Sequence, residues 1–255
     1  MEKIKEFTVE MLKICIYDNR TAMGRAAAAE AAMRIGKIIG DKGEAAIVFA
    51  AAPSQSEFIA ELCRQNVDWG KVNAYHMDEY IGLDQNAPQR FGNFLKRSIF
   101  DKVPLKSVHY MTNQEMDPSV IVENYEELLT QNPPDLVFLG VGENGHLAFN
   151  DPGMADFEDS RKVKIVNLDD VCRNQQVNDG CFEKFEDVPQ KAVTLTMSML
   201  MSIPEALAIV PGSTKTDAVC RTVHDPITTA FPATILRRHP GTILYTEREG
   251  GARLL

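Results

Sequence analysis

Short apolar runs alternate with helix-periodic segments along most of the chain, and this alternation limits its possible folds more than any other feature. Residues 45–52 and 136–139 are continuously apolar, as strands buried on both faces are. In such sheets each strand is followed by a helix that packs on one face. We therefore expect an α/β fold with a doubly wound, mostly parallel sheet and helices on both faces, which is Rossmann-like. No repeat or linker is visible, so residues 1–255 are predicted to form a single domain.

Local signals predict individual elements. Ala28, Ala32 and Ile35 recur at helical spacing, with Asp18 as the expected N-cap of that helix. Another helix is expected to begin at Pro53. The alternation over residues 162–167 is typical of an edge strand. Further strands are expected at residues 12–17, 72–76, 108–111, 192–196, 206–210 and 242–245.

Charge and apolar content bear on the partners of the protein. The formal net charge is −9 and the pI is about 5.1, whereas nucleic-acid-binding domains are usually basic. No apolar run is long enough to span a bilayer, and the N-terminus lacks the apolar core of a signal peptide. The five cysteines are scattered and include no CxxC pair, as is typical of reduced cytosolic proteins. We expect a cytoplasmic protein that binds neither nucleic acid nor membranes.

The strand predicted at residues 136–139 leads into a glycine-rich stretch, LGVGENGHLAFNDP, at residues 139–152. Glycine lets the backbone approach a ligand because no Cβ blocks the way, and Gly142 is a candidate for such an approach. A lone glycine motif is weak evidence, and a single histidine is often structural. Polar side chains nevertheless crowd this turn, which packing alone would not require. Our hypothesis is that the turn forms the floor of an active site with His146 as its proton carrier.

Polar residues also follow three other predicted strands. Because ligands bind outside the carboxyl ends of the strands in such sheets, these residues should meet at one edge. Local structure could explain each of them alone, but their joint position after four strands favours a site. The residues are Ser54, Asp78, Glu79, Asn144, His146, Asp151, Ser213 and Lys215.

Lys215 lies in the first turn of a predicted helix, directly behind Gly212 and Ser213. A helix N-terminus offers free N–H groups and the positive end of the helix dipole, so it attracts anions. A lysine there does not favour the helix electrostatically, although a solvated lysine is the alternative. We predict that Lys215 binds phosphate and that Ser54 contributes to the same anion site.

Two histidines raise the alternative of a metal site. His76 and Asp78 are separated by one residue, a spacing found among metal ligands, and His146 and Asp151 could add to the set. A strand directs His76 and Asp78 to the same face only if it continues through both. We therefore predict no bound metal.

Three strings resemble the glucosamine-6-phosphate deaminases, also called isomerases. They are YHMDEYIGL at residues 75–83, LGVGENGHLAFNDP at residues 139–152 and PGSTK at residues 211–215. Their order and spacing match that family over nearly the whole chain. The glycine–histidine string is shared with 6-phosphogluconolactonases, whereas the MDEY string is typical of the deaminase branch.

The resemblance implies an enzyme that breaks a C–N bond and converts an amino sugar 6-phosphate into a ketose 6-phosphate and ammonia. It implies that His146 helps to open the sugar ring and that Asp78 moves a proton between C2 and C1. Asn144 and Asp151 match the residues that orient and polarise the histidine. No cofactor is implied, because the protons move between side chains and substrate.

The phosphate end departs from the family pattern. Lys215 matches the family's phosphate-binding lysine, but Ala51, Ala52 and Ser54 belong to a segment that is usually Gly-Gly-Thr-Pro. Arg173 is the candidate for a phosphate-binding arginine, offset from its usual place. Asn144 stands where many members carry Asp. These differences suggest a divergent subgroup and leave the exact amino sugar open.

Two other functions fit the same residues. A 6-phosphogluconolactonase-like hydrolase would use His146 as a base on water and would not need Asp78. A non-catalytic sugar-phosphate sensor would keep the pocket, and the altered phosphate loop is compatible with one. Because family members are often oligomers, the resemblance also carries an expectation of a homo-oligomer.

Overall fold

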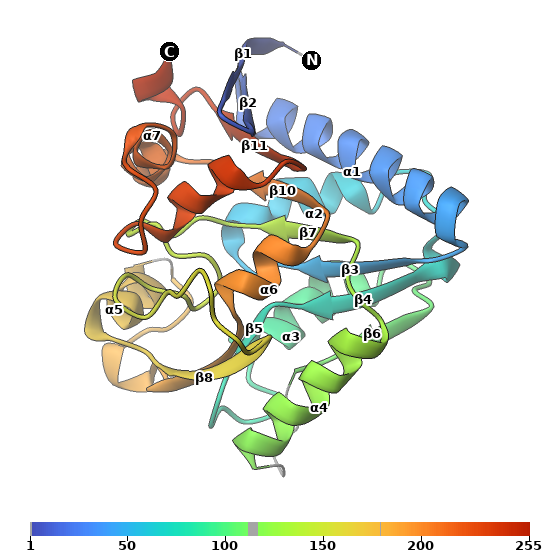
Figure 1. Cartoon of the computed structure of the whole chain (residues 1–255), viewed down its shortest axis with the longest axis vertical. Coiled ribbons are helices and arrows are strands. Elements are labelled where there is room, and N and C mark those ends of the chain that lie inside the picture. Colours follow the sequence, from blue (N-terminus) through green and yellow to red (C-terminus); the bar gives the residue numbers. More distant parts are fainter. Residues whose placement is uncertain (1, 112–116, 179) are drawn as a thin grey trace.

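An eight-stranded sheet forms the centre of the computed structural model, which describes residues 2–111, 117–178 and 180–255. Its strands pair in parallel except for β1 and β2, which form an antiparallel hairpin at one edge. The predicted doubly wound, mostly parallel sheet is therefore confirmed (Figure 1). In spatial order the strands are β1 Lys3–Val9, β2 Leu12–Tyr17, β11 Thr242–Glu247, β10 Glu205–Ile209, β7 Leu136–Leu139, β3 Ala45–Phe49, β4 Val72–His76 and β6 Ser107–His109.

Helices cover both faces of this sheet because successive strand residues point to opposite faces. In β3, Ile47 and Phe49 belong to the core on one face, whereas Ala46 and Val48 belong to the core on the other. The face of Ile47 and Phe49 is covered by α1 Arg20–Lys42, α2 Ser56–Leu62 and α3 Phe91–Leu95 with the π-helix Lys96–Phe100, and the other face by α4 Pro118–Gln131, α6 Met197–Ser202 and α7 Thr216–His224.

No helix in the described ranges has both the length and the apolar character that crossing a membrane would require.

The start of α1 differs by one residue from the prediction. Asn19 is the N-cap, because its side-chain oxygen accepts a hydrogen bond from the N–H of Ala22 at 2.9 Å. The expectation for Asp18 was wrong, since its carboxylate pairs with Arg248 at 2.9 Å instead. As a result Arg20 is the first residue of the helix and comes shortly after the carboxyl end of β2.

A second, three-stranded sheet begins one residue after the carboxyl end of β4. Its strands β5 Asp78–Tyr80, β9 Lys191–Leu195 and β8 Val163–Asn167 pair in an antiparallel manner in that order. The edge strand expected at residues 162–167 is confirmed as β8, which lies at the edge of this smaller sheet. The separate sheet was not predicted, because a strand of three residues such as β5 carries no periodicity.

The order of the strands creates a crevice between β3 and β7. From β3 the chain adds β4 and β6 toward one edge of the sheet, and from β7 it adds β10 and β11 toward the other. In open α/β sheets ligands bind at such a switch point, outside the carboxyl ends of the strands. The segments that follow β3, β4, β7 and β10 are therefore the natural place to look for a site.

Gly145 fixes the turn that follows β7. Its φ is +85°, in the left-handed region where a side chain is strained. A Cβ added there would also lie 2.6 Å from Cε1 of Phe231, which is far too close. The carbonyl of Gly145 accepts a hydrogen bond from the N–H of Ala233 at 2.8 Å, so the same contact anchors the turn. Both backbone conformation and space therefore require glycine.

Replacing Gly145 should destabilise the fold more than replacing a glycine that meets only one of these requirements. Gly153 has a φ of +86° but no atom within 4 Å of an added Cβ, so it is the matched control. We expect Gly153→Ala to lower the free energy of unfolding by about 1–2 kcal/mol. Gly145→Ala should lower it by the same amount and by about 1–3 kcal/mol more, because the new Cβ clashes with Phe231. Urea unfolding measures both, and equal losses would contradict the proposed packing.

Candidate functional site

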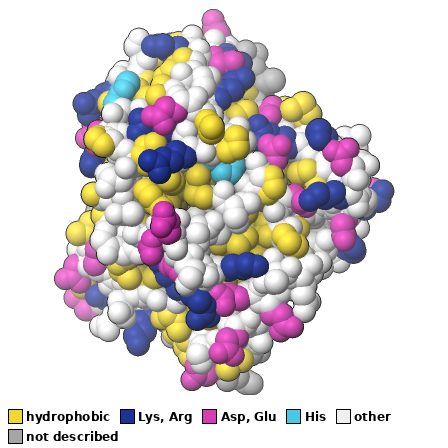
Figure 2. All heavy atoms as spheres, viewed as in Figure 1, with side chains coloured by type: hydrophobic (Ala, Val, Ile, Leu, Met, Phe, Trp, Pro, Cys, Tyr) yellow, Lys and Arg dark blue, Asp and Glu magenta, His cyan; other side chains and the backbone are white. Residues whose placement is uncertain are grey.

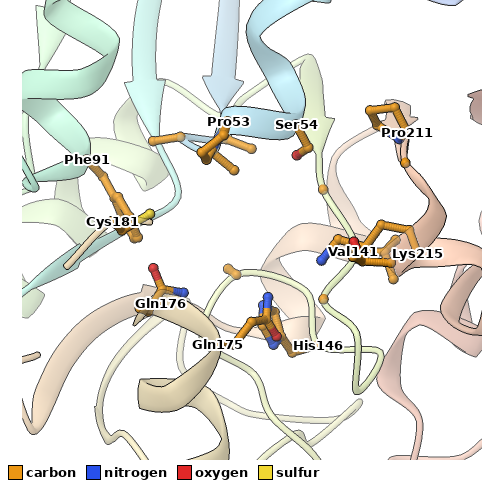
Figure 3. A pocket seen from close by; sticks show the side chains of 18 of the residues that line it. Pro53, Ser54, Phe91, Val141, His146, Gln175, Gln176, Cys181, Pro211 and Lys215 are labelled. Atoms are coloured by element: carbon orange, nitrogen blue, oxygen red, sulfur yellow. The ribbon is translucent and has the colours of Figure 1, made fainter. Parts of the chain in front are cut away.

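A cavity of about 370 Å³ opens at the crevice between β3 and β7 (Figure 3). Residues 50–54 after β3, 77–78 after β4, 140–142 after β7 and 211–215 after β10 contribute to its wall. A volume of this size is typical of sites for small molecules. The structure thus brings residues that follow four separate strands to a single cavity.

The imidazole of His146 packs against Gly142 in this wall. A Cβ added to Gly142 would lie 2.4 Å from Nδ1 of His146, so any larger residue would displace the ring. Nδ1 is 3.1 Å from Oδ1 of Asp151, although the two groups are not aligned for a hydrogen bond. The side chains are only 13% and 2% exposed, so water screens this contact weakly. Asp151 and His146 therefore form a buried ion pair whenever the imidazole is protonated.

Asn144 connects the backbone of His146 to the carboxylate of Asp151. Its Oδ1 accepts a hydrogen bond from the N–H of His146 at 3.1 Å, and its Nδ2 donates one to Oδ1 of Asp151 at 2.8 Å. Burial raises the pKa of Asp151, but the contacts with His146 and Asn144 outweigh burial and lower the pKa below its usual value. Asp151 therefore stays ionised beside the imidazole.

Asp78 lines the same cavity and is the first residue of β5. Burial, together with the neighbouring charge of Glu79, raises the pKa of Asp78 well above its usual value. Glu79 has a different environment, since its carboxylate accepts hydrogen bonds from the N–H groups of Phe91 and Gly92 at 3.1 and 3.0 Å. In the described part of the chain no such donor reaches the carboxyl of Asp78. This group is therefore buried, unpaired and turned toward the cavity.

His76, which suggested a metal alternative, is not part of the cavity wall. Its Nδ1 lies 2.9 Å from the carbonyl of Asp78, and its Nε2 lies 2.8 Å from the N–H of Met111. A carbonyl only accepts and an N–H only donates, so Nδ1 carries the proton and the ring is neutral. Burial lowers the pKa of His76 in agreement with this state. Within the described ranges, no three His, Cys, Asp or Glu side chains are grouped so as to hold a metal ion.

The residues expected at the phosphate end, apart from Arg173, all line the cavity. They are Ala51, Ala52, Ser54, Gly142 and Lys215, and Figure 3 shows Ser54 and Lys215 on the right-hand side of the view. Ala52 is extended, with φ −152°, so alanine meets no conformation reserved for glycine. The N–H groups of Ala51 and Ala52 have no acceptor within the described part of the chain. The altered loop therefore still presents free backbone donors.

Arg173 is placed away from this end of the cavity. Its Nη2 donates hydrogen bonds to the carbonyls of Phe185 and Val188, both at 2.9 Å, and its guanidinium lies 3.9 Å from the ring centre of Phe185. These contacts tie α5 Asp170–Asn178 to the segment that follows it. Arg173 therefore does not line the cavity, and we leave it out of the proposed site.

Gln175 and Gln176 of α5 line the cavity instead, and the sequence analysis missed them. They lie three and four residues after the buried Cys172, so helical spacing places them on the same face. The hydroxyl of Tyr80 donates to Oε1 of Gln176 at 2.8 Å, which leaves the amide N–H groups of Gln176 free to point toward the cavity (Figure 3). The spacing from Cys172 was the sequence signal that could have identified them.

Arg20 is a further lining residue that the sequence analysis missed. It comes soon after β2, so the rule that polar residues gather beyond strand ends could have included it. Cys181 and Glu249 also line the cavity without having been predicted.

A protein-family model described as Glucosamine-6-phosphate isomerases/6-phosphogluconolactonase matches residues 18–245 of this chain. The chain is 35% identical to the glucosamine-6-phosphate deaminase of Exiguobacterium sp. over 187 residues, which covers 73% of this chain and 72% of the relative. It is 32% identical to the glucosamine-6-phosphate deaminase of Bacillus cytotoxicus over 215 residues, which covers 84% of this chain and 80% of the relative.

Solved structures share the same fold. A monomeric glucosamine-6-phosphate deaminase superimposes with a TM-score of 0.83 at 24% identity and covers 94% of this chain and 98% of its own. A 6-phosphogluconolactonase from Thermotoga maritima gives a TM-score of 0.75 at 18% identity, with coverage of 92% and 99%. The resemblance first noted in three sequence strings is thus confirmed. The chain belongs to the family of glucosamine-6-phosphate isomerases and 6-phosphogluconolactonases.

Proposed function

We propose that the protein deaminates an amino sugar 6-phosphate, with glucosamine 6-phosphate as the first candidate, to give a ketose 6-phosphate and ammonia. The observation that carries the proposal is that one cavity is lined by an unpaired buried carboxyl, at Asp78, and by His146, whose imidazole contacts the carboxylate of Asp151 outside the cavity wall. The names of the relatives at 35% and 32% identity support the same activity. Because water breaks the C–N bond, the proposed reaction is a hydrolysis.

His146 acts first, on the closed sugar ring. The imidazole takes the proton of the C1 hydroxyl and, once protonated, gives a proton to the ring oxygen, which opens the pyranose to the aldehyde. The ionised Asp151, 3.1 Å from Nδ1 of His146, stabilises the protonated imidazole that this step uses. Asn144 connects the backbone N–H of His146 to the carboxylate of Asp151, so it helps to hold that carboxylate beside the histidine.

Asp78 acts on the open chain. Its carboxylate removes a proton from C2 and returns it at C1, while a proton from the amine nitrogen moves to the C1 oxygen, so the amino aldose becomes an imine of the ketose. One water then adds to the C2 carbon of the imine, and one ammonia leaves. A carboxylate with a raised pKa is a stronger base than an exposed one, and the environment of Asp78 provides such a pKa.

The phosphate end orients the substrate for these steps. Lys215 is only 8% exposed and forms no ion pair within the described part of the chain. Together with Ser54 and the free N–H groups of Ala51 and Ala52 it can hold a phosphate dianion. A phosphate fixed there brings the carbon chain across the cavity toward Asp78 and His146.

The reaction of a lactonase would not require the carboxyl of Asp78. Hydrolysis of a sugar lactone requires a base for water, and His146 supplies one. Burying the carboxyl of Asp78 without a hydrogen-bond donor costs free energy. Such a costly arrangement is typical of a group that takes part in the reaction. The likeness to lactonase structures, at 18% identity or less, concerns the fold. We therefore favour the deaminase.

The proposal predicts ammonia release from glucosamine 6-phosphate, coupled to the formation of fructose 6-phosphate. Asp78→Asn should lower kcat by on the order of 10²–10⁴ because the amide cannot accept the C2 proton. Asp187→Asn is the matched control: Asp187 is exposed, lies outside the cavity wall and should leave kcat unchanged.

Two other experimental outcomes would indicate a different function. Binding of the sugar phosphate by calorimetry without ammonia release would favour a sensor. Hydrolysis of 6-phosphogluconolactone that survives Asp78→Asn would favour a lactonase.

The same substitution should stabilise the fold in a pH-dependent way. The pKa of Asp78 is higher in the folded state than its unfolded value near 3.8, so ionisation opposes folding. This cost is absent below the unfolded pKa and complete above the folded pKa. Asp78→Asn should therefore raise Tm most at pH 8, by roughly 2–4 °C for each kcal/mol removed, and less at pH 6 and pH 5. Asp187→Asn should show no such trend, and a gain for Asp78→Asn that does not vary with pH would contradict the assigned environment.

A further inference from the structure

Arg20 is held at the rim of the cavity by a carboxylate that lies outside it. Its Nε and Nη2 donate to Oε1 and Oε2 of Glu57 at 2.8 and 2.9 Å. Two parallel hydrogen bonds of this kind fix the plane of a guanidinium and not only its position. Glu57 is the second residue of α2, so the pair joins the first turns of two neighbouring helices.

The spacing of these helices is set by Gly24, one turn after Arg20. A Cβ added to Gly24 would lie 3.0 Å from the backbone carbon of Glu57. The backbone of α2 therefore approaches α1 as closely as a glycine permits. This contact places Glu57 where Arg20 can reach it with both donors.

The opposite edge of the guanidinium has no hydrogen-bond partner among the residues that the structure describes. Arginine carries five N–H donors, and Glu57 uses one on Nε and one on Nη2. Nη1 lies close to Gly212, since a Cβ added there would be 3.7 Å from it. No acceptor for Nη1 is present in the described ranges of the chain. A planar pair of donors thus faces the segment that also carries Lys215.

Local charge matters here because the protein as a whole repels anions. The formal net charge is −9, and Figure 2 shows acidic and basic side chains interspersed over the visible face. Arg20 and Lys215 are the basic side chains of the described cavity wall apart from His146. Asp78 and Glu249 place carboxyl groups at the same cavity, so an anion must be held by direct contacts with the two cations and not by the overall field.

We propose that Arg20 is the second phosphate-binding cation of this site, and that it works together with Lys215 in the place that Arg173 does not fill. Glu57 orients the guanidinium, and the free Nη1 edge donates to the phosphate oxygens. This inference rests on the proposed function, because it assigns the phosphate end of the same substrate. Arg20 takes no part in proton transfer, so its contribution is to substrate binding.

The test compares Arg20→Gln with Arg25→Gln. Arg25 is also on α1 and pairs with Glu61 of α2 at 3.7 Å, but it does not line the cavity, so it controls for the loss of a helix–helix ion pair. We expect Arg20→Gln to raise KM for glucosamine 6-phosphate roughly ten- to a hundredfold, with kcat within about threefold of the parent. Arg25→Gln should change neither constant.

A second readout does not depend on turnover. Titration of inorganic phosphate by calorimetry should give a Kd that rises by a similar factor in Arg20→Gln and is unchanged in Arg25→Gln. Arg20→Lys should recover only part of the affinity, because an ammonium cannot engage Glu57 and phosphate through two planar edges at once. Thermal melting of all variants identifies any that fail to fold.

The outcomes separate this inference from the function itself. Ammonia release by the parent with an unchanged KM in Arg20→Gln would overturn the role of Arg20 and leave the deaminase proposal standing. Absence of ammonia release, with phosphate affinity that still depends on Arg20, would overturn the proposed function and support the anion site. If the parent does not bind phosphate at all, the inference fails.

Discussion

The site depends on four parallel strands that end at the same edge of one sheet. β10, β7, β3 and β4 are neighbours, and their pairing fixes the register of each against the next. Because side chains alternate between faces, a slip of one residue would reverse every strand side chain and break both cores. The register therefore positions the loops as well. Residues 50–54 and 211–215, far apart in sequence, share a cavity for this reason.

Features that arise from local sequence were predictable. The apolar run at β7 and the glycines after it predicted a strand followed by a tight turn, which the structure confirms at Leu136–Leu139 and Gly145. The rule that ligands bind beyond strand ends identified eight candidates. Five of them line the cavity, namely Ser54, Asp78, His146, Ser213 and Lys215, whereas Glu79, Asn144 and Asp151 do not. Their roles stay predictions, but their convergence follows from chain direction alone.

Features that depend on contacts distant in sequence were not predictable. Whether Arg173 or Gln176 faces the cavity depends on the rotation of α5, and the stacking of Arg173 on Phe185 belongs to a segment that follows the helix. Likewise the partner of Arg20 is Glu57, 37 residues away, and the spacing that joins them depends on the absence of a side chain at Gly24. The periodicity of a sequence indicates which face of a helix is apolar, but it does not indicate which element that face packs against.

The junction of the two sheets has a consequence for the entropy of catalysis. Met77 alone separates β4 of the large sheet from β5 of the small one, and its carbonyl accepts a hydrogen bond from the N–H of Leu195 at 2.8 Å. The backbone of Asp78 is thus immobilised from both sides before any substrate arrives. Ordering a loop residue on binding would subtract about 1–2 kcal/mol from the affinity. Here that loss of backbone entropy occurs during folding, before the substrate binds.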